Sequence, residues 1–330
     1  MVISRTPFRM SFFGGGTDNP IFFNKYGGSV ISSTFDKYCY VTLRHLPPYF
    51  DFKTHLTYSK MEYVNEVSEV EHPAIRNTMK FMNLSDIRLT YDADLPARSG
   101  LGTSSSFVVG MLNGFNALKG KYADKDYLSK SSIYIERVLC NESGGWQDQI
   151  AAAYGGFNRI DFYNDTYEVR PIIISNERKL KFQKNLMLFY TGVSRFSYEI
   201  LNDRIKNAEK NEYLKLLNKL TDEAETIFED ENSDLDEIGN LLGCEWDLKK
   251  KTGERISNVS IDEIYDKAVT AGALGGKILG AGGGGFMLFY VPYEKQECVK
   301  SILADLTLVS FKFENNGSQV IYYSPEDVIS

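Results

Sequence analysis

Residues Asp94 to Ser106 read DLPARSGLGTSSS and place a proline, two glycines and several hydroxyl side chains directly before an apolar helical pattern. The segment leading into them, DIRLTYDADL, alternates apolar and polar side chains as a half-buried strand does. After the motif, apolar residues from Phe107 to Leu118 recur at helical spacing, and Gly120 stands where a helix stop is expected. The sequence therefore predicts a glycine-rich loop between a strand and the N-terminus of a helix.

This loop has the properties of a phosphate-binding site. A helix N-terminus exposes unpaired N–H groups and a partial positive charge, which together bind phosphate. Gly100 and Gly102 would let the backbone approach an anion closely, and the hydroxyls that follow can cap the helix or ligate Mg²⁺. Taken alone, the motif fits a well-capped helix after a tight turn equally well. It matches neither the Walker pattern GxxxxGK[ST] nor the dinucleotide pattern GxGxxG.

Two further glycine clusters favour the ligand interpretation. RMSFFGGGTDNP lies near the N-terminus and LGAGGGGF near the C-terminus. A single glycine run is usually a flexible turn, whereas three in one chain indicate backbone that lines a ligand cleft.

Composition excludes several classes of function. The chain has 330 residues, a formal net charge of −7 and scattered basic residues, so nucleic acid is not expected as a partner. No apolar run reaches the roughly 18 residues of a membrane span, and the N-terminus does not resemble a signal peptide. The four cysteines and three histidines form no disulfide or zinc pattern, which predicts a reduced, cytoplasmic protein. A serine hydrolase is not indicated, because GxSxG is absent.

The order of elements predicts an α+β protein with two lobes. The N-terminal third is rich in strand patterns, and a helix is expected from about Asp126 to Cys140. NLMLFYTG, from Asn185 to Gly192, is predicted to be a buried strand. From Ser197 to about Lys251 the pattern is helical and highly charged, and GGKILGAGGGGFMLFYV reads as strand, glycine loop and strand.

Together the three glycine motifs resemble those of the GHMP kinase superfamily. PARSGLGTSS is similar to its second motif, with Thr103 in place of the first serine, RTPFRMSFFGGGTD to its first and KILGAGGGG to its third. Within the superfamily, TPFRMSFFGGGTDNPIFFNKYGG, WQDQIAAAYGGFN and GAGGGGFMLF are most similar to the D-glycero-D-manno-heptose 7-phosphate kinases. These motifs span almost the whole chain.

The resemblance implies a two-lobe fold, with ATP and substrate in the cleft between the lobes. Residues 1–175 would form a lobe of the ribosomal protein S5 domain 2-like type that binds ATP, and residues 176–330 a ferredoxin-like lobe. ATP and Mg²⁺ are the expected cofactors. A homodimer is compatible with the sequence.

The resemblance also implies roles for individual residues. Asp148 matches the catalytic aspartate, which would accept or orient the proton of the acceptor hydroxyl, and Arg9 matches a basic residue that stabilises negative charge. Glu136, twelve residues before Asp148, would hold Mg²⁺ together with Ser104. Each has an ordinary alternative: Asp148 could complement a helix dipole, Glu136 could be a helix-surface acid and Arg9 a surface arginine. Asp18 would hold sugar hydroxyls or form an Asx turn.

The expected ligand contacts fall into two sets. The ATP-binding set is Pro96, Arg98, Gly100, Leu101, Gly102, Thr103, Ser104 and Ser105. The substrate-binding set is Gly15, Gly16, Thr17, Asp18, Lys37, Arg195, Lys277, Gly282 and Gly283.

One departure from galactokinases bears on the substrate. They carry GEHTD where this chain has GGGTD, so Gly15 removes both bulk and negative charge near C6 of a sugar. A substrate with an anionic tail at that position would gain from the change. Lys37, Arg98, Arg195 and Lys277 are the candidate cations for such a phosphate, and each could equally be a solvated surface charge.

The leading hypothesis is a kinase that phosphorylates O1 of D-glycero-D-manno-heptose 7-phosphate, for nucleotide-heptose and surface-glycan synthesis. Another sugar 1-kinase, acting on fucose or a hexose, stays open. So does a catalytically silent sensor that binds sugar and ATP. A mevalonate kinase is disfavoured, because that group carries a lysine where Arg9 stands.

Overall fold

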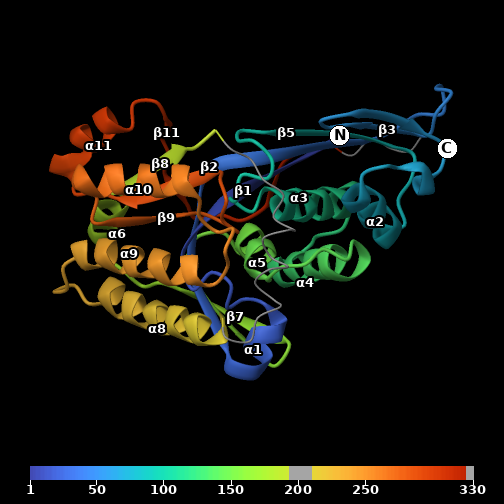
Figure 1. The fold of residues 1–330 in the computed structure, drawn as a ribbon. Helices are drawn as coiled ribbons and strands as arrows, with labels where there is room; N and C mark the ends of the chain where they lie inside the picture. The colour runs from blue at the N-terminus through green and yellow to red at the C-terminus, as the bar shows by residue number, and fades with distance from the viewer. Residues whose placement is uncertain (193–209, 325–330) are drawn as a thin grey trace.

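The computed structural model describes residues 1–192 and 210–324. Its larger sheet has nine strands in the order β13-β1-β2-β5-β3-β4, with β6 and β12 also pairing with β2, and β7 pairing with β6 (Figure 1). The strands of this sheet are β1 (Val2–Phe13), β2 (Gly28–His45), β3 (Thr54–Thr57), β4 (Met61–Val64), β5 (Ile87–Ala93), β6 (Phe157–Tyr163), β7 (Thr166–Pro171), β12 (Phe313–Glu314) and β13 (Gln319–Tyr323).

A second sheet has four antiparallel strands in the order β11-β8-β10-β9. They are β8 (Leu186–Tyr190), β9 (Gly275–Ile278), β10 (Phe286–Tyr290) and β11 (Thr307–Val309). The expected strand in NLMLFYTG and the strand, glycine loop and strand of the third motif are confirmed. The C-terminal strands β12 and β13 pair with β2 and β1, so the chain returns to the first sheet. The domain boundary at residue 175 stays a prediction.

The helices cover these sheets. The α-helices are α1 (Pro20–Tyr26), α2 (Pro73–Met82), α3 (Thr103–Leu118), α4 (Lys125–Tyr134), α5 (Gln147–Tyr154), α6 (Asn176–Lys184), α8 (Lys210–Glu229), α9 (Asp236–Lys251), α10 (Val259–Thr270) and α11 (Gln296–Ile302), with short turns η1 (Val67–Glu69), η2 (Ile135–Leu139) and η3 (Tyr293–Lys295). In Figure 1, α2, α3 and α4 lie on one face of the larger sheet, and α8 and α9 run side by side next to the smaller sheet. Among the described residues, no helix combines the length and the apolar character that crossing a membrane requires.

The glycine-rich loop lies where the sequence predicts. β5 ends at Ala93 and α3 begins at Thr103. α3 packs directly on β1 and β2 because Gly110 and Gly114 share one face of the helix: a Cβ on Gly110 would lie 2.9 Å from Thr6 Oγ1, and one on Gly114 2.6 Å from a methyl of Leu43. This close packing fixes the N-terminus of α3 beside β1.

Two apolar clusters hold the arrangement together. One lies between α2, α3 and the larger sheet and is built around Val41, Leu89 and Phe115. The other joins β1 and β2 to β8, β10, α8 and α9, and includes Phe12 and Leu288. Because the second cluster connects the two sheets, it fixes how residues of β1 face those of β9 and α9.

Candidate active site

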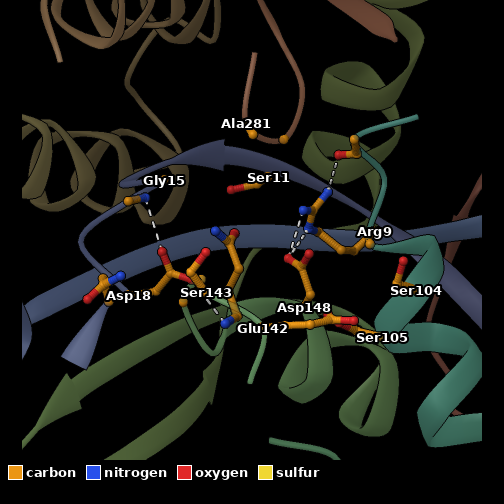
Figure 2. Close-up of a pocket in the computed structure, with 18 of the residues that line it drawn as sticks. Arg9, Ser11, Gly15, Asp18, Ser104, Ser105, Glu142, Ser143, Asp148 and Ala281 are labelled. Atoms are coloured by element: carbon orange, nitrogen blue, oxygen red, sulfur yellow. Dashed lines mark hydrogen bonds and ion pairs between the residues drawn. The ribbon is translucent and has the colours of Figure 1, made fainter. Parts of the chain in front are cut away.

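A single cavity brings together residues from both ends of the chain. It is lined by β1 and the loop after it, the glycine-rich loop before α3, the segment from η2 to α5, helices α8 and α9, and the loop after β9. In the view of Figure 2, Asp18 and Gly15 lie on one side, Ser104 and Ser105 on the other, and Arg9 with Asp148 between them. The motifs that the sequence singles out therefore meet at one place.

The glycine loops of the two ends touch. Gly100 has φ +85°, and a Cβ there would lie 2.4 Å from the carbonyl oxygen of Leu279; a Cβ on Gly280 would lie 2.5 Å from Cα of Gly100. Gly102 is the N-cap of α3 with φ 74° and ψ 21°, in the left-handed region that glycine adopts at little cost. These glycines let the N-terminus of α3 open into the cavity.

Arg9 and Asp148 form an ion pair at the centre of the cavity. Arg9 comes from β1, and Asp148 lies in the first turn of α5. The Arg9 Nε and Nη2 atoms both donate to Asp148 Oδ1, at 2.8 and 2.7 Å, and Nη1 donates to the carbonyl of Gly100 at 2.7 Å (Figure 2). Arg9 is almost fully buried, whereas the Asp148 side chain is 27% exposed. The carboxylate is therefore held in place and still accessible from the cavity.

Asp18 is fixed at the other side of the cavity. Its carboxylate accepts hydrogen bonds from the backbone N–H of Gly16 at 3.0 Å and of Gln147 at 3.1 Å. Burial raises the pKa of Asp18; the bond from Gln147 opposes this shift, and the nearby charge of Asp148 adds to it. A Cβ on Gly145 would lie 1.9 Å from an Asp18 oxygen, so the loop before α5 packs directly on this side chain.

Glu136 is buried in the π-helical turn η2, beneath the N-terminus of α3. Its Oε2 accepts a hydrogen bond from Ser105 Oγ at 2.8 Å and another from the Gln149 amide. Burial raises the pKa of Glu136 to about 7. The sequence pairs Glu136 with Ser104; in the structure Ser105 contacts Glu136, while Ser104 lines the cavity and is exposed. The reason is helical geometry, because consecutive residues point about 100° apart.

Most of the expected ligand contacts line this cavity. From the ATP set these are Arg98, Gly100, Gly102, Thr103, Ser104 and Ser105, and from the substrate set Gly15, Gly16, Asp18 and Lys277. Pro96, Leu101, Thr17, Gly282, Gly283 and Lys37 are not among the lining residues. Thr17 instead shapes the first glycine loop, since its hydroxyl donates to the carbonyls of Gly14 and Ser29. Arg195 lies outside the described residues.

Several lining residues have no counterpart in the sequence prediction. They are Ser11, Asn19, Ile21, Phe22, Arg137, Glu142, Ser143, Gly144, Gly145, Gln147, Asn211, Leu214, Lys249 and Thr252. Gly280 and Ala281, from the third glycine motif, line the cavity as the sequence predicts. Ser11 could have been found, because a residue two positions after Arg9 on a strand points to the same face. Lys249 and Thr252 give no such signal: they belong to a charged helix whose orientation only the tertiary structure shows.

The chain matches two family models in the order that the fold requires. Residues 62–156 match the GHMP kinases N terminal domain, and residues 224–305 match the GHMP kinases C terminal domain. The D-glycero-alpha-D-manno-heptose 7-phosphate kinase of Campylobacter jejuni is 30% identical over 95% of this chain and 97% of its own length. The chain belongs to the GHMP kinase family. It is a small-molecule kinase, and members of this family use ATP as the phosphoryl donor.

Other GHMP kinases are similar at lower identity. The L-fucokinase/L-fucose-1-P guanylyltransferase of Bacteroides fragilis is 25% identical over 91% of this chain and 35% of its own length. Among solved structures, a D-glycero-D-manno-heptose 1-phosphate kinase from Bacteroides thetaiotaomicron superposes with a TM-score of 0.79 at 24% identity, covering 98% of this chain and 100% of that one. The structural match shows the GHMP kinase fold.

Proposed function

We propose that this GHMP kinase transfers the γ-phosphoryl group of ATP to the anomeric O1 hydroxyl of a sugar phosphate, D-glycero-D-manno-heptose 7-phosphate. The observation that carries the proposal is the position of the Arg9–Asp148 pair, between the N-terminus of α3 and the Asp18 end of one cavity. A phosphoryl donor bound at the N-terminus of α3 and an acceptor bound at the Asp18 end would meet at Asp148. The similarity to heptose 7-phosphate kinase supports the choice of acceptor.

The N-terminus of α3 is the proposed site of the ATP phosphates. Its first N–H groups are unpaired within the helix and carry the positive end of the helix dipole. Gly100 and Gly102 leave room for the anion, and Arg98 adds a charge at the cavity wall. Phosphoryl transfer depends mainly on positioning and charge neutralisation, and this loop supplies both.

Asp148 would accept or orient the proton of the acceptor hydroxyl. The Nε and Nη2 atoms of Arg9 both contact Oδ1, which holds the carboxylate in one orientation. The same guanidinium lies within hydrogen-bond distance of the Gly100 carbonyl, next to the proposed phosphate loop. It would therefore also stabilise negative charge that develops on the transferred group.

The carboxylate and hydroxyl groups at the N-terminus of α3 are ligands that suit Mg²⁺. This ion is usually held by one or two carboxylates together with nucleotide oxygens and water, and a hydroxyl can complete the set. Glu136 lies buried below the N-terminus of α3, and Ser104 and Ser105 line the cavity above it. We propose that Glu136 and Ser104 hold the ion, with Ser105 positioning the carboxylate through their 2.8 Å hydrogen bond. When bound, Mg²⁺ neutralises the charge of the ATP phosphates.

Asp18 and Gly15 would define the acceptor end. The Asp18 carboxylate would accept hydrogen bonds from sugar hydroxyls, and its two backbone donors hold it in one orientation. Gly15 adds no side chain to this end of the cavity, which leaves space for a substituent on C6. Nucleotide-heptose synthesis for a surface glycan is the pathway that such an activity would serve.

A sugar 1-kinase of the fucokinase type is the second candidate. It is favoured by the fucokinase relative, which covers 91% of this chain. A free fucose has no phosphate, so the two candidates differ in what the Gly15 end of the cavity must hold. A silent sugar and ATP sensor is less well supported, because Arg9, Asp148, Ser104 and Glu136 all line the one cavity.

An assay of ADP release tests the proposal. Wild type and Asp148→Asn would be given ATP, Mg²⁺ and one acceptor at a time: D-glycero-D-manno-heptose 7-phosphate, mannose 6-phosphate, mannose, fucose, galactose or mevalonate. Turnover of heptose 7-phosphate by wild type alone supports the activity and the role of Asp148. Turnover of fucose alone supports the second candidate. If the protein binds ATP but turns over none of these acceptors, the result supports a catalytically silent sensor of sugar and ATP.

A further inference from the structure

We propose that Arg137 is a positioning residue that fixes the acceptor end of the cavity through a single peptide group. This inference rests on the proposed function, in which Asp18 holds the acceptor sugar. Arg137 follows Glu136 in the π-helical turn η2 and lines the cavity, and its side chain is 18% exposed. It belongs to none of the three glycine-rich motifs.

The guanidinium of Arg137 holds one backbone carbonyl of the loop between η2 and α5. Its Nη2 and Nε atoms donate to the carbonyl oxygen of Gly145, at 2.8 and 3.2 Å. The remaining nitrogen, Nη1, lies 4.0 Å from a carboxylate oxygen of Glu142, which is too far for a hydrogen bond. Hydrogen bonds from a charged donor are roughly twice as strong as neutral ones. The guanidinium therefore acts mainly on the Gly145 carbonyl.

The same peptide group contacts Asp18 through its opposite side. The carbonyl of Gly145 and the N–H of Trp146 belong to one planar unit, in which they point in opposite directions. The N–H of Trp146 donates to the Asp18 carbonyl at 3.1 Å, and the next N–H, that of Gln147, donates to the Asp18 carboxylate at 3.1 Å. The peptide group thus lies between Arg137 and Asp18. Because the unit is rigid, fixing its carbonyl also aims its N–H.

Two consecutive glycines let the loop pass between these side chains. A Cβ on Gly144 would lie 3.2 Å from Cζ of Arg137, closer than an ordinary van der Waals contact, and its φ of +149° favours glycine. A Cβ on Gly145 would lie 1.9 Å from an oxygen of Asp18. Side chains here would push the loop away from the guanidinium or from the carboxylate. The glycines therefore keep both contacts short.

Asp148 has a separate support. Arg9 donates to its carboxylate twice, and Arg9 comes from β1 rather than from η2. Figure 2 shows Asp18 and Asp148 apart from each other, with Arg9 beside Asp148. Removing Arg137 should therefore loosen the Asp18 end and leave the proposed base oriented. This predicts a larger effect on acceptor binding than on the chemical step.

Steady-state kinetics of Arg137→Met and Arg137→Lys test the inference. We expect the KM for D-glycero-D-manno-heptose 7-phosphate to rise about 10-fold in Arg137→Met, because charged hydrogen bonds that hold the loop are lost. The KM for ATP and kcat should stay within about 3-fold of wild type. Arg137→Lys keeps a charged donor and should recover part of the loss. A fall in kcat with an unchanged acceptor KM would instead mean that Arg137 contacts the transferred phosphoryl group, and would overturn the inference.

Hydrogen exchange gives a readout that does not depend on activity. The amides of Trp146 and Gln147 should exchange about 10-fold faster in Arg137→Met, because their bonds to Asp18 open more often. Mass spectrometry of a peptide that covers the loop before α5 measures this. Unchanged exchange, or an unchanged acceptor KM, in a folded variant would also overturn the inference. If Arg137→Met does not fold, Arg137→Lys decides by the same two measurements.

Arg178→Met is the matched control. Arg178 lies in α6, is 8% exposed and donates through Nε and Nη2 to the carbonyls of Phe228 and Ile227, and it does not line the cavity. Its acceptor KM and its loop exchange should equal those of wild type. Equal changes in both variants would indicate general destabilisation and contradict the role of Arg137.

Failure of the proposed function is visible in wild type alone. If wild type turns over a different acceptor, the KM for that acceptor replaces the one for heptose 7-phosphate, and the expected ratio between variants is the same. If wild type turns over none, the exchange of the two loop amides decides whether Arg137 fixes this peptide group.

Discussion

The Arg9 guanidinium contacts a single oxygen of Asp148 through two of its nitrogens, at 2.8 Å from Nε and 2.7 Å from Nη2. These residues lie 139 positions apart in the chain, on β1 and α5. A third nitrogen of the same guanidinium reaches the Gly100 carbonyl at 2.7 Å. One buried side chain thus orients the proposed base and contacts the proposed phosphate loop, so the two are positioned relative to each other.

Asp148→Asn should lower kcat by about 10²- to 10⁴-fold, because the amide cannot accept the proton of the acceptor hydroxyl. The KM for ATP should stay within about 3-fold of wild type, since Asp148 does not belong to the phosphate loop. Steady-state kinetics at saturating acceptor measure both constants. Asp126→Asn, which changes an exposed acid of α4, is the control. A kcat within tenfold of wild type would rule out Asp148 as the base.

Gly100→Ala should abolish ATP binding or folding. A Cβ at this position would lie 2.4 Å from the Leu279 carbonyl, and backbone cannot move away as a flexible side chain could. Gly120→Ala tests the contribution of the conformation alone: Gly120 also has a positive φ, +67°, but nothing lies within 4 Å of its Cβ. Thermal unfolding and ATP titration should show a loss of about 1 kcal/mol in stability for Gly120→Ala and normal ATP affinity. If the two variants lose the same stability and ATP affinity, the contact between the two glycine loops does not contribute to either property.

Gly15→Glu should fold normally and change selectivity. The position accepts a side chain without strain, and its carboxylate would occupy the space beside Ser11 and repel a phosphate. We expect kcat/KM for heptose 7-phosphate to fall about 100-fold, which corresponds to about 2.7 kcal/mol, while that for a free sugar falls much less. Gly15→Ala adds a small neutral group and serves as the control. An equal loss on both kinds of acceptor would argue against a phosphate at this end.

Glu136 should make the free energy of unfolding depend on pH. Its pKa is raised by burial to about 7 in the folded state, so between its ordinary value of about 4.3 and about 7 the folded chain binds more protons than the unfolded chain. Its contribution is fully present below the unfolded pKa and is lost as pH rises through the folded pKa. Urea unfolding without metal measures the free energy of unfolding at pH 5 and at pH 8. Between these two values it should fall less in Glu136→Gln than in wild type. If the free energy of unfolding changes equally with pH in the two proteins, Glu136 is not the group that causes this pH dependence.

Lys277→Met should destabilise the chain strongly. Lys277 is 2% exposed and Glu245 is fully buried, so removing the lysine leaves a carboxylate without its counter-charge, at a cost of about 3–5 kcal/mol. The second oxygen of Glu245 already has no hydrogen-bond partner among the described residues. The double variant Glu245→Leu/Lys277→Met should recover most of the loss in urea unfolding. If the double variant is as unstable as Lys277→Met, the bond from Lys277 to the Phe12 carbonyl matters more than the ion pair.

The local structure around the glycine-rich loop before α3 could be predicted from the sequence. The alternation in β5, the helical spacing of α3 and the glycines between them are short-range signals, and each limits the backbone through its own sterics. The same holds for the strand, glycine loop and strand formed by β9 and β10. Family resemblance added Arg9, Asp18, Glu136 and Asp148 because their neighbours in the chain form motifs.

The structure decided which side chains meet. Ser105 rather than Ser104 contacts Glu136, since one residue along a helix turns the side chain by about 100°. Lys249 enters the cavity because the apolar cluster between α9 and the sheets fixes which face of α9 points inward. The sequence by itself determined the glycine-rich loop between β5 and α3, because the signals of its strand, turn and helix are short-range. It also indicated the family and its fold, because each motif is a continuous stretch of the chain. The cavity depends on contacts between distant parts of the chain, such as the bond from Lys277 to the carbonyl of Phe12, 265 positions away, and only the tertiary structure shows these.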